Sequence, residues 1–189
     1  MSEITADVYQ SAVLQVNPDY MQIAAQLDAE RAAGHVRGPL HGIPFLVKDN
    51  IASKDRMETT AGSWALLGSI VPRDAFVLSK LRDAGALLFG KATLSEWADM
   101  RSSNYSEGYS GRGGQARSAY NLTVNPGGSS SGSAIAVAAN MIMFALGTET
   151  DGSGKIRDAS FAKTGTLIQS QSSILPNETA SWASNPRWA

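Results

Sequence analysis

Two serine-bearing turns frame the stretch Gly127–Ser153, and both serines could carry out nucleophilic chemistry. A glycine- and serine-rich turn, Gly127–Gly132, opens the stretch, and a second turn, Gly147–Ser153, closes it. An alanine-rich run and a short apolar run lie between the turns, so we expect one helix and one strand there. The fold can then bring Ser129 and Ser153 together, although 24 positions separate them (153 − 129).

A serine nucleophile needs a base to take its proton, and the chain offers few. Its only histidines are His35 and His41, which lie in a Gly/Pro-rich stretch and are more typical of solvated loop positions. Lysine is the other base that partners serine, and it must be neutral, which burial favours. Lys48 follows the apolar run Phe45–Val47 and is therefore our candidate base, although a lysine that ends a strand is often simply exposed.

Other interpretations of the serine-rich turn stay open. Gly127–Gly132 could be a flexible linker, or a helix N-terminus that binds phosphate. It also fits the nucleophile elbow G-x-S-x-G with Ser130 at its centre, but both histidines precede it and no good strand leads into it. The P-loop pattern fails around Gly154-Lys155, because Ile156 stands where Ser or Thr is required. The second turn could be an ordinary turn. Alternatively, it could carry Ser153 as a nucleophile on a tight turn, where the N–H groups of Thr150–Ser153 converge on one point and would hold a developing oxyanion.

The elements that must position these residues alternate along the chain. Apolar runs predict buried strands at 45–47, 86–89 and 142–146, and apolar stripes predict helices at 18–33, 74–84 and 133–141. Asn17 and Asp74 are the expected caps of the first two helices, and a capping box at Thr93–Glu96 predicts a short helix there. This alternation indicates an α/β architecture.

Composition bounds the function classes. The chain has 189 residues, 43% hydrophobic and 17% charged, which predicts one globular domain with a sizeable core. The net charge of −1 argues against nucleic acid as a partner. The sequence contains no cysteine, and we see neither a signal peptide nor a membrane-spanning run, so a cytoplasmic location is expected. Oligomeric state is not predicted.

Five stretches, in this order, resemble the amidase signature family of Ser–Ser–Lys hydrolases. The resemblance runs from about Asn17 to Ser153. The stretches are Gly38–Asn50 (GPLHGIPFLVKDN), Thr59–Ser63 (TTAGS), Gly90–Trp97 (GKATLSEW), Asn125–Ala134 (NPGGSSSGSA) and Gly147–Ser153 (GTETDGS).

The resemblance implies a role for each matching residue. Lys48 is similar to the general base, Ser129 to the bridging serine that an unusual cis peptide holds, and Ser153 to the acyl-forming nucleophile. The backbone N–H groups of Thr150, Asp151, Gly152 and Ser153 resemble the oxyanion hole. The implied reaction is hydrolysis of a small-molecule amide through an acyl-serine, with no metal or organic cofactor. The implied fold is a mixed sheet between helix layers.

The match to the family pattern ends at Ser153. We therefore expect a weakly helical segment at 1–16, a partial amidase domain at 17–153 and a polar, disordered tail at 154–189. Gly154-Lys155 can be encoded by GGTAAG, which contains a common intron start, so the tail could derive from an unspliced intron. Such an incomplete domain is expected to have little or no amidase activity. The alternative functions are a non-catalytic binding remnant and an amidotransferase-type subunit.

Overall fold

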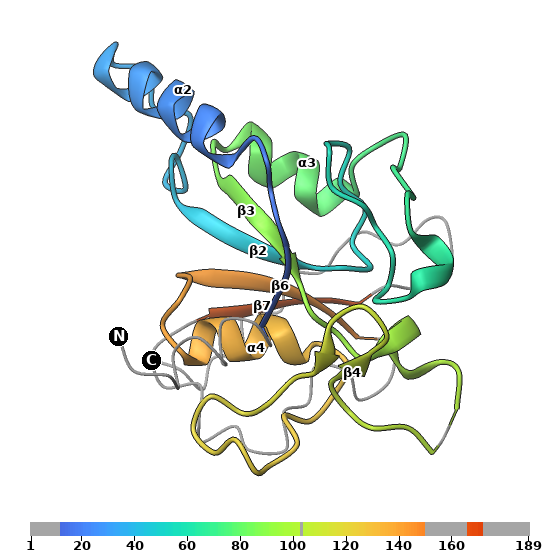
Figure 1. Ribbon diagram of the computed structural model, residues 1–189. Helices are drawn as coiled ribbons and strands as arrows, with labels where there is room; N and C mark the ends of the chain where they lie inside the picture. The colour runs from blue at the N-terminus through green and yellow to red at the C-terminus, as the bar shows by residue number, and fades with distance from the viewer. Residues whose placement is uncertain (1–11, 103, 150–165, 172–189) are drawn as a thin grey trace.

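The chain forms one five-stranded sheet with helices on both faces (Figure 1). The computed structural model describes residues 12–102, 104–149 and 166–171. Its elements are β1 (Val13–Val16), α2 (Tyr20–Ala32), β2 (Pro44–Lys48), the 3-10 helix η1 (Trp64–Leu66), α3 (Phe76–Asp83), β3 (Leu87–Ala92), the 3-10 helix η2 (Glu96–Asp99), β4 (Tyr109–Ser110), β5 (Gly114–Gln115), α4 (Ser131–Ala138), β6 (Phe144–Glu149) and β7 (Thr166–Gln171).

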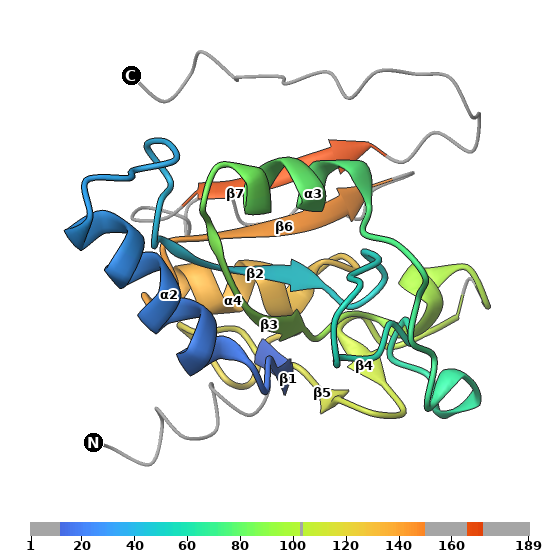
Figure 2. The ribbon, with the colours of Figure 1, turned by 90° about the horizontal axis from the view of Figure 1, so that it is seen from above.

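Four strands of this sheet are parallel, and their carboxyl ends share one edge. The strand order is β1-β3-β2-β6-β7, and only β1 pairs in the antiparallel sense, with β3. Val47 in β2 is in register with Lys91 in β3 and with Leu146 in β6. Figure 2 shows these strands pointing the same way. In open parallel sheets this carboxyl edge is where sites usually form, and Lys48 lies on it.

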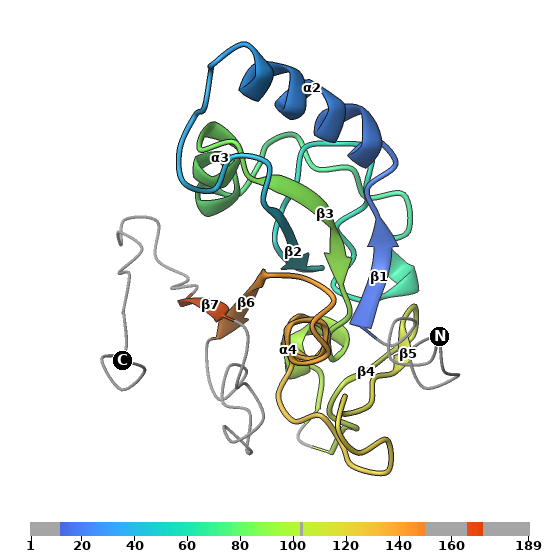
Figure 3. The same ribbon diagram turned by 90° about the vertical axis from the view of Figure 1, so that its left-hand side faces the viewer.

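Side chains alternate between the two faces of β2, and each face has its own core. Phe45 and Val47 pack with Leu78 of α3, whereas Leu46 packs with Ile135 of α4. Figure 3 shows α3 and α4 on opposite sides of the sheet. Each fully buried side chain of this size contributes about 1.5–3 kcal/mol of hydrophobic stabilisation. By the same alternation Lys48 points to the α4 side, toward the serine-rich turn.

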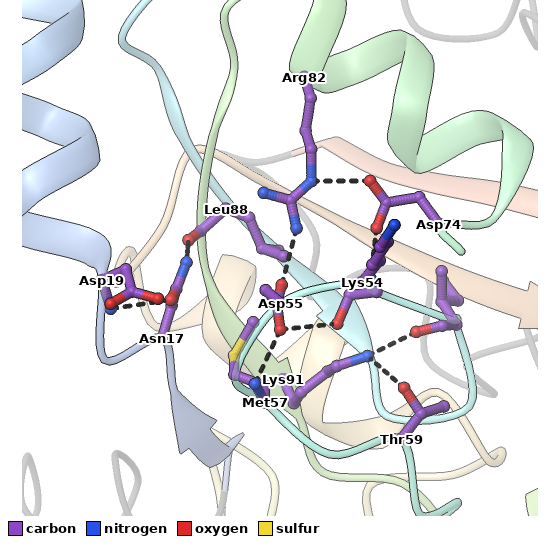
Figure 4. A network of polar contacts seen from close by, with 12 residues as sticks. Asn17, Asp19, Lys54, Asp55, Met57, Thr59, Asp74, Arg82, Leu88 and Lys91 are labelled. Atoms are coloured by element: carbon purple, nitrogen blue, oxygen red, sulfur yellow. Dashed lines mark hydrogen bonds and ion pairs between the residues drawn. The ribbon is translucent and has the colours of Figure 1, made fainter. Parts of the chain in front are cut away.

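The expected mixed α/β class is confirmed, and the predicted helices and strands occur within a few residues of their expected places. Two expected helix caps are wrong. The Asn17 carboxamide donates to Leu88 O at 3.0 Å and accepts from Asp19 N at 3.0 Å, which delays the start of α2 to Tyr20. The Asp74 carboxylate forms an ion pair with Arg82 instead of capping α3 (Figure 4).

The capping box at Thr93–Glu96 is also wrong. Only the 3-10 helix η2 follows, and Trp97, Ala98 and Asp99 all have positive φ angles. Ser95 uses its hydroxyl to accept from Gly108 N at 2.8 Å, so that oxygen is held by a distant loop rather than by its own helix.

Two expectations about the ends of the chain need correction where the structure describes them. Val13–Val16 is a strand, not a weak helix, because this stretch, with valine at both ends, pairs with β3 and forms the edge strand of the sheet. Thr166–Gln171 is a strand parallel to β6, so disorder does not hold for these six residues. The other residues of both segments, 1–11, 154–165 and 172–189, lie outside the described residues. Among the described helices, none is long and apolar enough to cross a membrane.

Candidate active site

Lys48 ends β2 with a fully buried side chain that donates to three oxygens. Its Nζ lies 2.7 Å from Ser129 Oγ, 3.1 Å from Ser130 Oγ and 3.1 Å from Thr148 O. Two acceptors come from the serine-rich turn and the third from β6, so the fold brings together groups 81 to 100 positions apart. The sequence-predicted pair of Lys48 and Ser129 is therefore in direct contact.

Burial makes Lys48 a base near neutral pH. It lowers the pKa of the Lys48 ammonium from 10.5 to about 7, while the charges of Asp99 and Glu149 oppose this shift. All three hydrogen-bond acceptors are neutral, and no carboxylate of the described residues forms an ion pair with Lys48. A buried ammonium without a paired anion is expensive, and the neutral amine is the form that can accept a proton.

The turn that carries Ser129 is held by backbone contacts on both sides. Gly127 and Gly128 have φ angles of +71° and +61°, a region that side chains rarely adopt, which lets the chain turn sharply before the helix. Ser129 is fully buried, and its carbonyl accepts from Ser95 N at 3.2 Å. A Cβ on Gly132 would lie 2.4 Å from Thr93 O, so only glycine lets α4 approach the end of β3 this closely.

The cis peptide expected at Ser129 is not found. The described residues contain no cis peptide bond. For a residue other than proline the trans form is lower in energy, and here the contact with Lys48 forms with trans peptides throughout the described turn.

Ser130 is part of the same cluster, in a way that the sequence patterns did not predict. Its Oγ accepts from Lys48 and from Thr148 N at 3.3 Å, and it donates to Thr148 O at 3.1 Å. No described strand leads into Ser130, and His41 is occupied with Leu27 O and Arg37 N, so the nucleophile-elbow interpretation fails. In the sequence, the run of three adjacent serines and the G-x-S-x-G pattern marked Ser130, but neither predicted its contacts with Lys48 and Thr148.

The remaining predicted residues, Ser153 and the N–H groups of Thr150–Ser153, lie outside the described residues. Strand β6 runs to Glu149, one position after Thr148. Thr148 is itself tied to Asn50, whose side-chain Nδ2 donates to Thr148 Oγ1 at 3.0 Å. The strand that leads to the second turn is thus anchored to the residues next to Lys48.

A second buried lysine, Lys91 of β3, lies near the carboxyl edge of the sheet, on the face opposite to that of Lys48. Lys91 is fully buried, and burial lowers its pKa to about 8 while the charge of Asp49 opposes the shift. Its Nζ donates to Ile51 O and, at 3.2 Å, to Thr59 Oγ1 (Figure 4). Asp49 is also buried and accepts from Gly62 N at 3.0 Å. These contacts hold the loop that follows β2 and leave Lys48 as the lysine that faces the serines.

Residues 2–160 match the family model described as Amidase. A putative amidase of Schizosaccharomyces pombe is 74% identical over 145 residues, which cover 77% of this chain and 25% of that protein. A glutamyl-tRNA(Gln) amidotransferase subunit from Symbiobacterium thermophilum is 47% identical over 144 residues, 75% of this chain and 28% of that one. The native peptide amidase structure from Stenotrophomonas maltophilia superposes with a TM-score of 0.76 at 51% identity, covering 80% of this chain and 31% of that one. The chain thus spans roughly a quarter of the length of these curated relatives.

Proposed function

The chain belongs to the amidase family, and from this premise we propose that its site hydrolyses an amide C–N bond through an acyl-serine intermediate, with Lys48, Ser129 and Ser153 as the catalytic residues. The observation that carries the proposal is the 2.7 Å hydrogen bond between Lys48 Nζ and Ser129 Oγ, two fully buried side chains. A neutral lysine that contacts a serine is the arrangement a base needs in order to activate a hydroxyl.

In the proposed acylation step, Ser153 Oγ attacks the carbonyl carbon of the amide. Its proton passes to Ser129 Oγ, and the Ser129 proton passes to Lys48, which becomes an ammonium. A tetrahedral oxyanion forms, and the backbone N–H groups of Thr150–Ser153 are the proposed donors to it. Collapse of this intermediate breaks the C–N bond, and the leaving amine takes a proton back by the same relay.

In the proposed deacylation step, water replaces the amine. The relay removes a proton from the water as its oxygen attacks the acyl carbon, and the proton returns to Ser153 as the ester bond breaks. The products are a carboxylic acid and a regenerated triad. The relay accounts for every proton, and the proposed cycle uses neither a metal nor an organic cofactor.

We also propose that the 189-residue chain turns over amides slowly or not at all. The match covers about a quarter of the length of these relatives, and the activity of the relatives belongs to their whole chains. We also propose that residues 17–153 form a partial amidase domain. Activation of the nucleophile, in contrast, depends on Lys48, the serine turn and the second turn, which all lie within this chain.

An amidotransferase-type subunit is the second candidate, supported by the 47% identity to a subunit of a glutamyl-tRNA(Gln) amidotransferase. The 74% identity to a putative amidase and the likeness to a peptide amidase favour a stand-alone amidase. A non-catalytic binding remnant is the third candidate, and it predicts that none of the serines reacts with an active-site probe.

Labelling with a fluorophosphonate, which phosphonylates activated serines with loss of fluoride, tests the proposed function. We expect the purified chain to be labelled at Ser153, as located by mass spectrometry of its peptides. Ser153→Ala should abolish labelling, and Lys48→Met should reduce it by about 100-fold or more. Ser173→Ala, a serine outside the family match, is the matched control and should label as the parent does. A folded chain that is not labelled at Ser153 would contradict the proposal.

A further inference from the structure

Thr148 lies in β6 just past the point where the backbone pairing between β2 and β6 ends. These strands are neighbours in the sheet (Figure 2), and their last pair in register is Val47 with Leu146. The chain after β2 then turns toward β3, since Asp49 N donates to Ala92 O at 3.1 Å. Strand β6 continues through Thr148. On the side that faces β2, side chains therefore hold Thr148 where the backbone pairing has stopped.

Each hydrogen-bonding group of Thr148 has a side-chain partner at this edge. Its carbonyl accepts from Lys48 Nζ at 3.1 Å and from Ser130 Oγ at 3.1 Å, and its N–H donates to Ser130 Oγ at 3.3 Å. Its hydroxyl accepts from Asn50 Nδ2 at 3.0 Å and lies 3.4 Å from Asn50 Oδ1. Asn50 comes two positions after Lys48, so the segment that carries the base also holds the hydroxyl of the residue that the base contacts.

The contacts of Thr148 decide which hydroxyl can share the lone pair of a neutral Lys48. A neutral amine has two N–H donors and one lone pair. A carbonyl oxygen only accepts, so Thr148 O takes one N–H of Lys48. Ser130 has a single hydroxyl hydrogen and donates it to Thr148 O, so toward Lys48 it can only accept the second N–H. The lone pair is left for the Ser129 hydroxyl, which is the closest of the three groups, at 2.7 Å.

We propose that Asn50 is a positioning residue: through the Thr148 hydroxyl it holds the Thr148 carbonyl where that carbonyl orients the Lys48 lone pair toward Ser129. The inference rests on the proposed function, in which Lys48 takes its proton from Ser129. An amine rotates about its bond to the side chain, so only its partners fix the direction of its lone pair. If Thr148 O moved away, one N–H of Lys48 would lose its acceptor, and small misplacements of a catalytic group are costly in rate.

A double-mutant cycle tests this role in the full chain, with the rate of fluorophosphonate labelling per folded molecule as the measurement. Asn50→Ala removes the amide, and Thr148→Val removes the hydroxyl but keeps the branched shape and the backbone groups. Each should slow labelling about three- to tenfold, the range that one neutral hydrogen bond supplies. The double variant should be no slower than either single variant, because both changes remove the same contact. Parent-like rates in both single variants, or effects that multiply in the double variant, would overturn the proposal.

A conservative variant covers the case in which Asn50→Ala fails to fold. Thr148→Ser keeps the hydroxyl that Asn50 binds, so it should label about three- to tenfold faster than Thr148→Val. Equal rates in these two variants would equally overturn the proposal. The matched control is Gln26→Ala, which removes an exposed amide that donates to Glu30 on α2 and should leave the labelling rate unchanged.

Amide hydrogen exchange separates this inference from the proposed function. Asn50→Ala should speed exchange at the Thr148 amide about three- to tenfold, while Ala145, in the paired part of β6, stays as protected as in the parent. Equal acceleration at both amides would mean that Asn50 merely supports the strand, which would overturn the positioning role. Faster exchange at Thr148 alone, in a chain that is never labelled, would contradict the proposed function and leave the link between Asn50 and Thr148 intact.

Discussion

The Nζ atom of Lys48 lies 2.7 Å from the Oγ atom of Ser129, across 81 positions of sequence and with both side chains fully buried. The contact exists because β2 ends at the same sheet edge at which α4 begins, with the serine turn between. The chemistry that we propose depends on this pair.

The two buried lysines should make the fold more stable as the pH rises above neutral. Burial lowers the pKa of Lys48 to about 7 and that of Lys91 to about 8, whereas both titrate near 10.5 when unfolded. Between these values the unfolded chain binds more protons, so raising the pH favours the folded state. We expect the free energy of unfolding in urea to rise between pH 8 and 10, by up to about 1.4 kcal/mol per pH unit for each lysine.

Lys48→Met supplies the control for this pH dependence. Methionine has a similar length and no charge, so the variant should lose the share of the slope that belongs to Lys48 and keep that of Lys91. A parent chain whose stability is flat or falls between pH 8 and 10 would show that the lysines are charged in the folded state, contrary to the lowered pKa values.

Ser129→Ala and Ser130→Ala should differ in rate although both remove a hydroxyl that contacts Lys48. Ser129 carries the proposed proton relay, so its loss should slow fluorophosphonate labelling by about 10²- to 10⁴-fold. Ser130 contacts Lys48 and both backbone groups of Thr148 but carries no proton in the proposed relay, so its loss should slow labelling by less than about tenfold, or about 1.4 kcal/mol in the barrier. Equal rates in the two variants, with both folded, would count against Ser129 as the relay.

Gly132→Ala should prevent α4 from packing against the end of β3. The added Cβ would lie 2.4 Å from Thr93 O and 2.6 Å from Ala12 O, and both are backbone atoms that cannot move aside cheaply. We expect a loss of about 3 kcal/mol or more in unfolding free energy, or failure to fold. Gly38→Ala is the matched control, because its Cβ would meet its nearest atom, Ala84 O, at an ordinary 3.5 Å. Similar stabilities for the two variants would contradict the close approach of α4.

Asp49→Asn should loosen the loop that follows β2. The buried carboxylate accepts from the Thr60 hydroxyl at 2.6 Å and from Gly62 N at 3.0 Å through one oxygen. An asparagine oxygen in that position is still an acceptor but lacks the negative charge that strengthens both hydrogen bonds. Hydrogen exchange at the Thr60 and Gly62 amides should therefore speed up by about tenfold, the difference between a hydrogen bond to a charged group and one to a neutral group. The exposed-site variant Asp83→Asn should leave these amides as protected as in the parent, and equal protection in Asp49→Asn would refute this role.

The sequence predicted most helices and strands near their observed places, and the family resemblance predicted the Lys48–Ser129 pair. Neither predicted β1, β7 or the groups around the pair. The apolar run before Lys48 predicted a buried strand with a lysine at its end, and β2 has that form. Patterns near Thr93–Glu96 predicted a capped helix, yet the tertiary contacts of Ser95 and Trp97 impose a left-handed turn instead. Propensity reflects only neighbours along the chain, so an override by distant contacts is invisible to it.

Ser130 illustrates the same limit at the site. It is one of three adjacent serines, and what distinguishes it is a partner far away in sequence, the backbone of Thr148. The pairing of β7 with β6 was hidden for a related reason, because Thr166–Gln171 has no apolar alternation that marks it as a strand.

We propose that neutral Lys48 activates Ser153 through Ser129, and the pH dependence of labelling can show whether it does. The rate of fluorophosphonate labelling at Ser153 is measured from about pH 5 to 10 beside the NMR titration of Lys48 in the same chain. If Lys48 is the base, the labelling rate should rise once with increasing pH, and the midpoint of this rise should coincide with the Lys48 pKa, near 7. A Lys48 pKa that stays near 10.5, or a labelling rate that does not follow the Lys48 titration, would contradict it.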